Sequence, residues 1–334
     1  MTTDHTTPGQ STTGRNAVSG PVTLVADIGA TNARFGLIDG TGIHGSRVLR
    51  CADFPSLEAA ALAYLGGVAH DARPSRGAFA IAGPVTGDAV LMTNRGWSFS
   101  TAEVRGKLGL ERLAVINDFT AVALSVPRLT AADVRQVGEG APVPGRVVGV
   151  IGPGSGLGVS GLVPGAEGWT ALAAEGGHVT MAPVSDRESA VLAQLRKSFD
   201  HVSAERVLSG PGLVNLYQAL CVLDHQEPEP FTPAQVSDAA TANTNPHCVE
   251  AVEMFCAMLG TVAGNLALTL GARGGIYIAG GIVPKLGTLF THSRFRKRFM
   301  EKGRMRDFLA PIPTYVITHE LPAFLGLAEA AERA

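Results

Sequence analysis

Short runs of apolar residues recur along the chain, and each run is bounded by glycine, asparagine or aspartate. Runs with so few polar positions are typical of strands that are covered on both faces of a sheet. We therefore predict strands at Phe79–Ala82, Leu113–Ile116, Val147–Ile151, Ile276–Ala279 and Tyr315–Ile317.

Segments with helical character lie between these runs. Ser100–Glu103 and Ser185–Glu188 each have the spacing of a capping box, and Thr232–Gln235 carries a proline at the first helical position, where an N–H is dispensable. Apolar positions that share one helical face follow in 57–68 and 252–266. Strands that alternate with helices predict α/β lobes.

The segment Val22–Ile38 consists of two apolar stretches joined by a short polar turn. Gly29 allows a tight bend in which backbone N–H groups face an anion. Thr31 and Asn32 add side-chain donors, and Asp27 places a carboxylate beside the turn. A phosphate-binding hairpin is therefore one interpretation, although an ordinary turn that binds nothing is the commoner meaning of such a sequence taken alone.

The chain repeats this pattern at Gly145–Val163, where a turn rich in glycine again separates two apolar runs. Two such hairpins, one near the start of each half, predict two similar lobes that hold a nucleotide's phosphates across a cleft. A third glycine element, Gly274–Pro284, follows a predicted strand, and Gly280 and Gly281 would let an adenine ring lie close to the backbone. Each element alone is also explained as a tight turn.

Asp118 follows the predicted strand Leu113–Ile116 and precedes the apolar helical stretch Phe119–Leu124. Ligand sites of α/β folds lie at such carboxyl ends of strands, and a carboxylate there suits a general base. A helix N-cap is the competing interpretation, because aspartate before an apolar helix is a good cap. These residues alone leave both roles open.

Glu175 and His178 flank two glycines, so one turn can bring a carboxylate, an imidazole and the backbone onto a small polar ligand. A sugar is such a ligand, because carboxylates accept hydrogen bonds from hydroxyl groups and histidine can donate or accept. A core histidine and a surface carboxylate are the commoner fates of each residue alone. Glu205 and Asn94 are further polar candidates that a solvated helix and a turn explain equally well.

The composition restricts the class of protein. A chain of 334 residues exceeds the usual size of one hydrophobic core. The net charge of −2 gives no bulk attraction to nucleic acid or to anionic membranes, so we predict neither partner. The longest apolar stretch, 255–270, is interrupted by polar residues and glycines, which favours a buried helix over a membrane span. The four cysteines lack metal-ligand spacing and fit a cytoplasmic compartment.

Two polar segments carry separate expectations. Residues 1–20 are rich in threonine, serine and glycine and have neither an apolar core nor a basic start, so we expect a disordered tail rather than a secretory signal. The basic run 294–306 is punctuated by Phe295, Phe299 and Met305. This pattern favours an amphipathic surface helix or helix pair over a nucleic-acid site.

Six motifs follow one another in an order that is more specific than any single turn. They are Asp27–Arg34, Ile116–Thr120, Gly152–Gly158, Glu175–His178, Ser203–Gly212 and Ala279–Pro284. On these motifs, residues 21–334 resemble the bacterial glucokinases of the proteobacterial type. The cysteine-rich zinc motif typical of ROK sugar kinases is missing.

The resemblance implies the actin-like, ribonuclease-H-like fold of hexokinases, which is an α/β fold with two lobes and a cleft between them. Residues 21–127 would form a small lobe, 128–321 a large lobe, and the C-terminal helix 322–334 would return to the small lobe. Members of this family commonly form homodimers and use Mg²⁺ with ATP.

The resemblance also implies roles for individual residues, with Asp118 as the general base. The sugar hydroxyl groups would be held by Asn94, Asn117, Asp118, Glu175, His178 and Glu205. ATP would be held by Ala26, Asp27, Ile28, Gly29, Ala30, Thr31, Asn32, Gly154, Ser155, Gly156, Gly280 and Gly281. Ala30 and Ser155 depart mildly from the family pattern, which more often has glycine and threonine there.

The expected reaction is transfer of the γ-phosphoryl group of MgATP to the 6-hydroxyl of glucose, the first step of glycolysis. Asp118 would take the hydroxyl proton, and Asp27 would hold Mg²⁺ through water. Three alternatives are a kinase for another hexose, a sugar-responsive regulator without catalysis and an actin-like ATPase scaffold. The sequence leaves open the phosphoryl donor and the range of hexoses.

Overall fold

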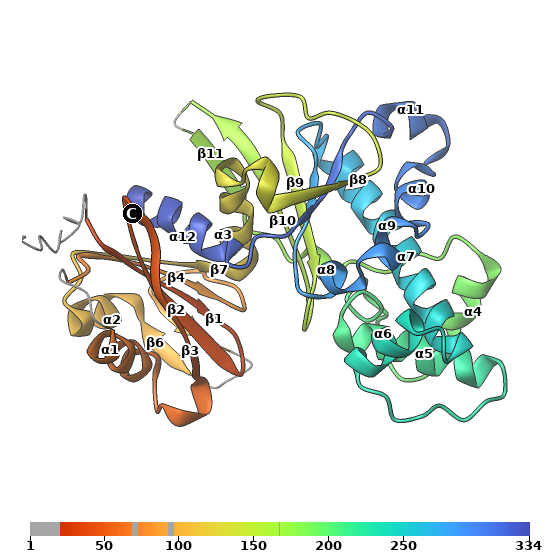
Figure 1. Cartoon of the computed structure of the whole chain (residues 1–334), viewed down its shortest axis with the longest axis horizontal. Coiled ribbons are helices and arrows are strands. Elements are labelled where there is room, and N and C mark those ends of the chain that lie inside the picture. The colour runs from red at the N-terminus through yellow and green to blue at the C-terminus, as the bar shows by residue number, and fades with distance from the viewer. Residues whose placement is uncertain (1–20, 69–72, 93–96, 167) are drawn as a thin grey trace, which may run out of the picture.

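The computed structural model describes residues 21–68, 73–92, 97–166 and 168–334, so the predicted tail at 1–20 lies outside the described residues. The described chain forms two α/β lobes that lie side by side along the long axis of the molecule (Figure 1). Each of the five strands predicted from apolar runs overlaps an observed strand, so these predictions are confirmed.

The first lobe is built on a five-stranded sheet with the order β3-β2-β1-β4-β7. Its strands are β1 (Thr23–Ile28), β2 (Asn32–Asp39), β3 (Gly42–Arg50), β4 (Arg76–Ile81) and β7 (Arg112–Asn117). The first three strands are antiparallel neighbours, and β1, β4 and β7 run parallel. A short hairpin of β5 (Ala89–Leu91) and β6 (Ser98–Ser100) lies beside the sheet.

Helices cover both faces of this sheet because its central strands carry buried apolar residues on both sides. Leu24, Ala26 and Ile28 share a core with α1 (Leu57–Gly67) and with Val104 of α2 (Thr101–Leu108). Val25 packs on the other face, against α3 (Asp118–Ser125) and the C-terminal α12 (Pro322–Arg333). Since neighbouring side chains of a strand point to opposite faces, one unbroken apolar run serves both cores.

The second lobe repeats the strand order of the first. Its six-stranded sheet has the order β11-β10-β9-β12-β13-β8. The strands are β8 (Val134–Val137), β9 (Val148–Pro153), β10 (Leu157–Gly165), β11 (Gly168–Leu172), β12 (Ile276–Ile278) and β13 (Thr314–Ile317). Three antiparallel strands are again followed by two parallel ones, and β8 is added at the edge. The predicted two-lobed fold is therefore confirmed.

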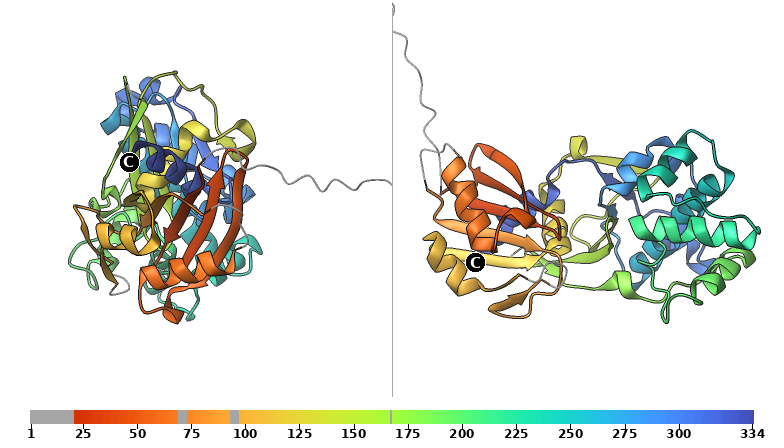
Figure 2. Two further views of the ribbon diagram at one scale, coloured as in Figure 1. Left: turned by 90° about the vertical axis from the view of Figure 1, so that its left-hand side faces the viewer. Right: turned by 90° about the horizontal axis from the view of Figure 1, so that it is seen from below.

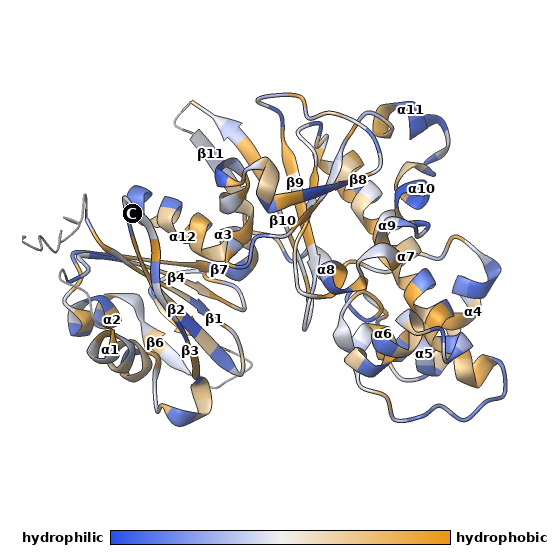
Figure 3. Cartoon of the chain, viewed as in Figure 1, coloured by the Kyte–Doolittle hydropathy of each residue, from blue (hydrophilic) through white to orange (hydrophobic). Residues whose placement is uncertain are grey.

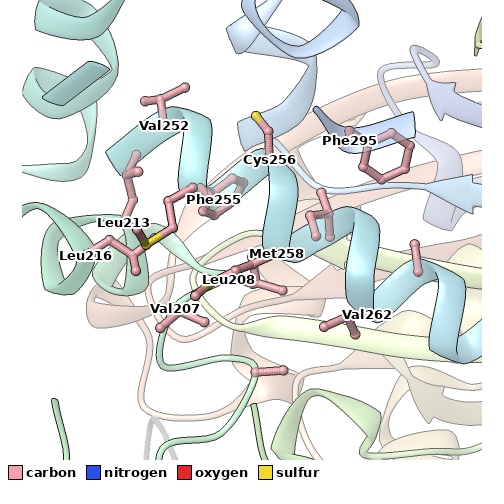
Figure 4. Close-up of a cluster of buried hydrophobic side chains, with 14 of the residues drawn as sticks. Val207, Leu208, Leu213, Leu216, Val252, Phe255, Cys256, Met258, Val262 and Phe295 are labelled. Atoms are coloured by element: carbon pink, nitrogen blue, oxygen red, sulfur yellow. The ribbon is translucent and has the colours of Figure 1, made fainter. Parts of the chain in front are cut away.

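Helices make up the outer part of the second lobe (Figure 1). They are α4 (Asp186–Leu195), α5 (Gly210–Leu223), α6 (Pro233–Thr241), α7 (Pro246–Leu270), α8 (Ile282–Leu286), α9 (Thr288–Thr291), α10 (Phe295–Met300) and α11 (Arg306–Leu309). Helix α7 is the one described helix that is long and apolar enough to cross a membrane, but most of its apolar window is buried inside this lobe. Figure 4 shows its side chains packed against those of α5 and α10, and Figure 3 shows the apolar residues along its length.

The predicted helix starts are confirmed by their caps. The Ser100 hydroxyl accepts a hydrogen bond from the N–H of Glu103, and Ser185 does the same for Glu188. Thr232 and Gln235 form a reciprocal capping box at the start of α6. These local signals are independent of tertiary contacts, which is why they could be read from the sequence.

The basic run at 294–306 forms the predicted helix pair, α10 and α11, with Phe295 and Phe299 buried, but two of its arginines are not solvated. Arg298 is only 2% exposed, and its guanidinium donates to both carboxylate oxygens of Glu188, at 2.6 and 3.1 Å, and to the hydroxyl of Thr261, at 2.9 Å. Arg296 donates to three backbone carbonyl groups. Two of the arginines therefore join α10 to the rest of the lobe.

Helices α3 and α12 pack against each other where the lobes meet. A Cβ on Gly326 of α12 would overlap the carbonyl oxygen of Ala121, so glycine lets the two helices approach closely. Arg128 donates to Glu329 at 2.8 Å, and Arg333 donates to the backbone carbonyl of Trp169 in the second lobe. The end of the chain thus lies against the first lobe (Figure 2).

Candidate active site

Asp118 begins helix α3 directly after strand β7. The cap of this helix is Asn117, whose Oδ1 accepts from the N–H groups of Phe119, at 2.9 Å, and Thr120, at 3.1 Å. The Asn117 amide also donates to the carbonyl of Gly83 at 3.2 Å. The competing interpretation of Asp118 as the N-cap is therefore wrong, because its neighbour fills that role. The Asp118 carboxylate accepts one hydrogen bond, from the N–H of Phe119 at 2.9 Å.

The surroundings of Asp118 favour its protonated form more than water does. Burial raises the pKa of Asp118 to about 6, the N–H of Phe119 acts against this rise, and the nearby carboxylates of Asp27 and Glu175 add to it. A carboxylate with this pKa is mostly ionised at neutral pH. Its conjugate acid is nonetheless weak enough for it to accept a proton from a substrate, as a general base must.

Asp27 lies in the central strand β1, opposite Arg34 of β2 in the hairpin register. Burial raises the pKa of Asp27, and the positive charge of Arg34 acts in the opposite direction. Arg34 ends the motif Asp27–Arg34 but was not among the predicted site residues. Counting outward from the turn would have found it, because antiparallel pairing places residues at equal distances from a turn across from each other.

Asp27, Arg34 and Asp118 line one cavity of about 500 Å³ between the lobes. Gly280 and Gly281 line the same cavity from the second lobe, which brings two of the predicted ATP-binding elements together. The cavity also contains polar side chains that the motifs did not include, namely Lys285, His319 and Glu320. These residues follow the last glycine motif and carry no local signal of a site.

The turn between β1 and β2 is exposed, and the N–H of Cys51 donates to its Thr31 carbonyl at 2.9 Å. Ala30, Thr31 and Asn32 are exposed, and the N–H of Gly29 donates to the carbonyl of Asn32 at 3.0 Å. Gly29 is not in the left-handed region, and an added Cβ would meet only the Asn32 carbonyl, at 3.5 Å. The expectation that this bend depends on glycine is therefore wrong. The side chains of the preceding Ala26 and Ile28 are buried in the core, which leaves only their backbone for a ligand.

The turn between β9 and β10 is closed by neighbouring groups. The N–H of Gly210 donates to the carbonyl of Gly154 at 2.8 Å, and the N–H of Leu157 donates to Oε2 of Glu205 at 2.8 Å. A Cβ on Gly156 would overlap that same carboxylate oxygen. Ser155 lies at the tip of this turn. The structure thus joins a predicted sugar-binding residue directly to a predicted phosphate turn.

Gly280 is required by its backbone conformation. Its φ is +83°, and an added Cβ would overlap the carbonyl oxygen of Pro153 at the end of β9. A side chain here would collide with backbone, which cannot move aside as a flexible side chain can. The third glycine element is therefore pressed against the β9–β10 hairpin.

The predicted sugar-binding residues border two further cavities. Asn117 and Glu175 line one of about 340 Å³, and His178 and Glu205 line another of about 390 Å³. Nε2 of His178 lies 3.9 Å from Oε2 of Glu175, and their side chains are 61% and 59% exposed. The electrostatic effect of Glu175 on Asp118 connects this group to the central cavity. Asn94 lies outside the described residues.

A sequence model of the glucokinase family matches residues 24–334. The chain belongs to the glucokinase family. It is 54% identical over 308 residues to the glucokinase of Paramagnetospirillum magneticum, which covers 91% of this chain and 96% of the relative. It is 53% identical over 313 residues to the glucokinase of Aromatoleum aromaticum, with 93% and 95% covered. The family predicted from the motif order is therefore confirmed.

Solved glucokinase structures share the fold. The glucokinase from an Antarctic psychrotroph superimposes with a TM-score of 0.85 at 36% identity, over 95% of this chain and all of that one. A ROK family glucokinase from Streptomyces griseus, solved with glucose and AMPPNP, has a TM-score of 0.67 at 18% identity over 94% of this chain and 100% of that one, so it shows the fold alone. Family membership makes the chain an enzyme, an ATP-dependent glucose kinase, rather than a scaffold or regulator.

Proposed function

We propose that this glucokinase uses Asp118 to take the proton from the 6-hydroxyl of glucose while that oxygen attacks the γ-phosphorus of ATP. The supporting observation is the arrangement at the start of α3. Asn117 caps the helix, so Asp118 is free to line the central cavity beside Asp27, and its pKa is about 6. A base with a pKa near the working pH is effective in proton transfer.

The reaction is an in-line displacement. The bond between the sugar oxygen and the γ-phosphorus forms, the bond from that phosphorus to the bridging oxygen of ADP breaks, and the hydroxyl proton goes to Asp118. Positioning and charge stabilisation supply most of the catalysis in such transfers. ATP would be held by the turn Gly29–Asn32, the turn Gly154–Gly156 and the pair Gly280 and Gly281, in agreement with the cavity that joins Asp27 to the two last glycines.

We assign Asp27 to Mg²⁺ through water. The residues fit this ion, because Asp27 and Asp118 are two carboxylates on one cavity and Mg²⁺ in kinases commonly binds one or two carboxylates, water and substrate phosphates. Among the described residues, no group of three or more side chains could hold a metal alone. When bound, Mg²⁺ neutralises phosphate charge that Asp27 would otherwise repel.

The hydroxyl groups of the sugar would be held by Asn117, Glu175, His178 and Glu205, together with Asn94. The exposed carboxylate of Glu175 and imidazole of His178, 3.9 Å apart, can reach neighbouring hydroxyl groups of one ring. A second hexose remains the closest alternative substrate, because changing one hydroxyl group alters only one or two of these contacts. Comparing kcat/KM for glucose, mannose and galactose decides between them.

We also propose a cytoplasmic homodimer that acts at the entry of glucose into glycolysis. The four cysteines are small buried side chains, which suits a reducing compartment. Sedimentation of the purified protein tests the dimer, and a monomer at the concentration of the assay would contradict it.

The function is tested by following glucose 6-phosphate formation from glucose and ATP, with Asp118→Asn as the variant. We expect glucose binding, measured by calorimetry, to persist while kcat falls on the order of 10²–10⁴-fold. Asp186→Asn is a matched control, because Asp186 is also the first residue of a helix after its cap but is exposed on α4. Near-normal turnover of Asp118→Asn would overturn the assignment.

A further inference from the structure

The ring of Phe119, the residue after the proposed base, lies across the β9–β10 hairpin of the other lobe. A Cβ on Gly158 would overlap this ring, and a Cβ on Gly152 would lie 2.6 Å from its Cζ. Gly152 and Gly158 are paired opposite each other in the hairpin register. The missing side chains of two facing strand residues therefore make a socket that the ring fills.

The socket is adjacent to both nucleotide elements of the second lobe. An added Cβ on Gly152 would also lie 2.7 Å from the carbonyl carbon of Ala279, the residue before Gly280. Gly158 follows the turn whose Gly156 touches Glu205. The ring of Phe119 thus lies against β9 and β10, the strands that carry the phosphate turn. It also lies beside the loop at Ala279–Gly281, and both this loop and Phe119 line the central cavity.

Phe119 holds the Asp118 carboxylate through its backbone. Its N–H lies 2.9 Å from Oδ1 of Asp118 and 2.9 Å from Oδ1 of Asn117, so it is shared between the base and the cap. Because the ring and this N–H belong to one residue, a shift of the ring that moves the backbone of Phe119 also moves the N–H that holds the Asp118 carboxylate. Figure 1 shows α3 between the first sheet and strands β10 and β11.

We propose that Phe119 is a positioning residue, whose ring in the Gly152–Gly158 socket sets the place of Asp118 relative to the phosphate turns of the second lobe. This inference rests on the proposed role of Asp118. Asp118 belongs to the first lobe and the phosphate turn between β9 and β10 belongs to the second. A misplacement of about 1 Å between reacting groups can lower the rate about 10²-fold. The direct contact between the Phe119 ring and the β9–β10 hairpin fixes the distance between Asp118 and that turn.

The first test is Phe119→Ala. We expect kcat to fall on the order of 10–100-fold, with the KM for ATP nearly unchanged, because the phosphate turns themselves are intact. Phe119→Leu should restore part of kcat, since a branched side chain still reaches the socket. Unaltered kcat in a folded Phe119→Ala protein would overturn the proposal.

The second test is a double-mutant cycle with Gly158→Ala. The added methyl group displaces the ring, so Gly158→Ala alone should lose kcat as Phe119→Ala does, and the double variant should be no slower than Phe119→Ala. Gly149→Ala is the control. Gly149 lies in β9, which pairs with β10, and its Cβ would meet Ile276 of β12 at 2.5 Å without a contact to Phe119. Its effect should multiply with that of Phe119→Ala. If the losses in kcat of Phe119→Ala and Gly158→Ala instead multiply in the double variant, the two residues act independently and the proposed socket is refuted.

A pH profile separates positioning from general loss of folded protein. If the ring positions Asp118, its removal changes the surroundings of that carboxylate, so the acidic limb of kcat/KM should shift, whereas loss of folded enzyme would lower the curve without moving it. The titratable and charged groups that line the cavity with Asp118 and stay in place are Asp27, Arg34, Lys285, His319 and Glu320, and Glu175 acts on Asp118 electrostatically from the neighbouring cavity. An unmoved limb would contradict the proposal. If Asp118 is not the base, Asp118→Asn stays active, while the 119–158 coupling is measured independently.

Discussion

The β1–β2 hairpin of the first lobe and the β9–β10 hairpin of the second occupy the same place in two sheets of the same strand order, but their turns are held differently. The first turn is exposed, and Gly29 has no steric need to be glycine. The second is fixed by the hydrogen bonds from Gly210 N–H to the Gly154 carbonyl and from Leu157 N–H to Glu205, and a Cβ on Gly156 would displace the Glu205 carboxylate. Cys51 holds the first turn through backbone carbonyl groups alone, so its side chains stay exposed, whereas the second turn is held by the Glu205 side chain.

The chemistry is divided in the same way. The first lobe carries the two partly buried carboxylates of the central cavity, Asp27 and Asp118, whose pKa values are raised by burial. The second lobe carries Glu175, His178 and Glu205, and the glycines that let its hairpin, its loop at 280 and the ring of Phe119 pack closely. Reactive groups thus belong to one half, and most of the surface that orients the substrates belongs to the other.

The largest expected effect on stability concerns the ion pairs of the two lobes. Arg298→Ala should lower the free energy of unfolding of the second lobe by about 3–5 kcal/mol, because it leaves the Glu188 carboxylate buried without its partner. Lys107→Ala is the control in the first lobe, since Lys107 is exposed in its 2.7 Å pair with Glu58. Urea unfolding should show a large shift for the first variant and almost none for the second. Equal shifts would contradict this contrast.

Alanine at each turn glycine compares the two hairpins directly. In Gly156→Ala the Glu205 carboxylate must move away and lose the N–H of Leu157, so we expect the KM for glucose to rise about tenfold or more, as for loss of a charged hydrogen bond. Gly29→Ala should leave thermal stability and the KM for glucose unchanged and raise the KM for ATP, whose phosphates would approach that backbone. If Gly29→Ala destabilises the fold, the first turn does depend on glycine at this position, which would contradict the contrast between the two turns.

Asp118→Asn should stabilise the protein while it removes turnover. The folded pKa of about 6 lies above the ordinary value of 3.8, so the ionised carboxylate opposes folding and stability falls as the pH rises from about 4 to about 6. Asparagine does not ionise, so the variant does not lose stability over this pH range. We expect a gain of about 1–3 kcal/mol at pH 8 that disappears at pH 4, measured by urea unfolding at both values. A loss at pH 8 would show that the charge is stabilised in the folded protein.

The structural features that depend on local patterns were predicted correctly from the sequence. Apolar runs, capping serines and the repeated strand–turn–strand motif indicated the elements and the duplicated lobes, because these follow from neighbouring residues. The resemblance named Asp118, but only the structure shows that Asn117 takes the capping role. Long-range packing was beyond local patterns, as the burial of Arg298 and the contact of Phe119 with Gly158 show. A further long-range contact distinguishes the two turn glycines, because a Cβ at residue 156 would meet the Glu205 carboxylate and a Cβ at residue 29 would meet no distant residue.

The central claim is that Asp118 is the base and that burial in the first lobe sets its pKa. The most direct measurement is the pH dependence of kcat/KM for glucose at saturating MgATP, in the native enzyme and in Asp118→Asn. The account predicts an acidic limb with a pKa of about 6 in the native enzyme and a low residual activity without that limb in the variant. An identical limb in both proteins, or one near the ordinary aspartate value in the native enzyme, would contradict it.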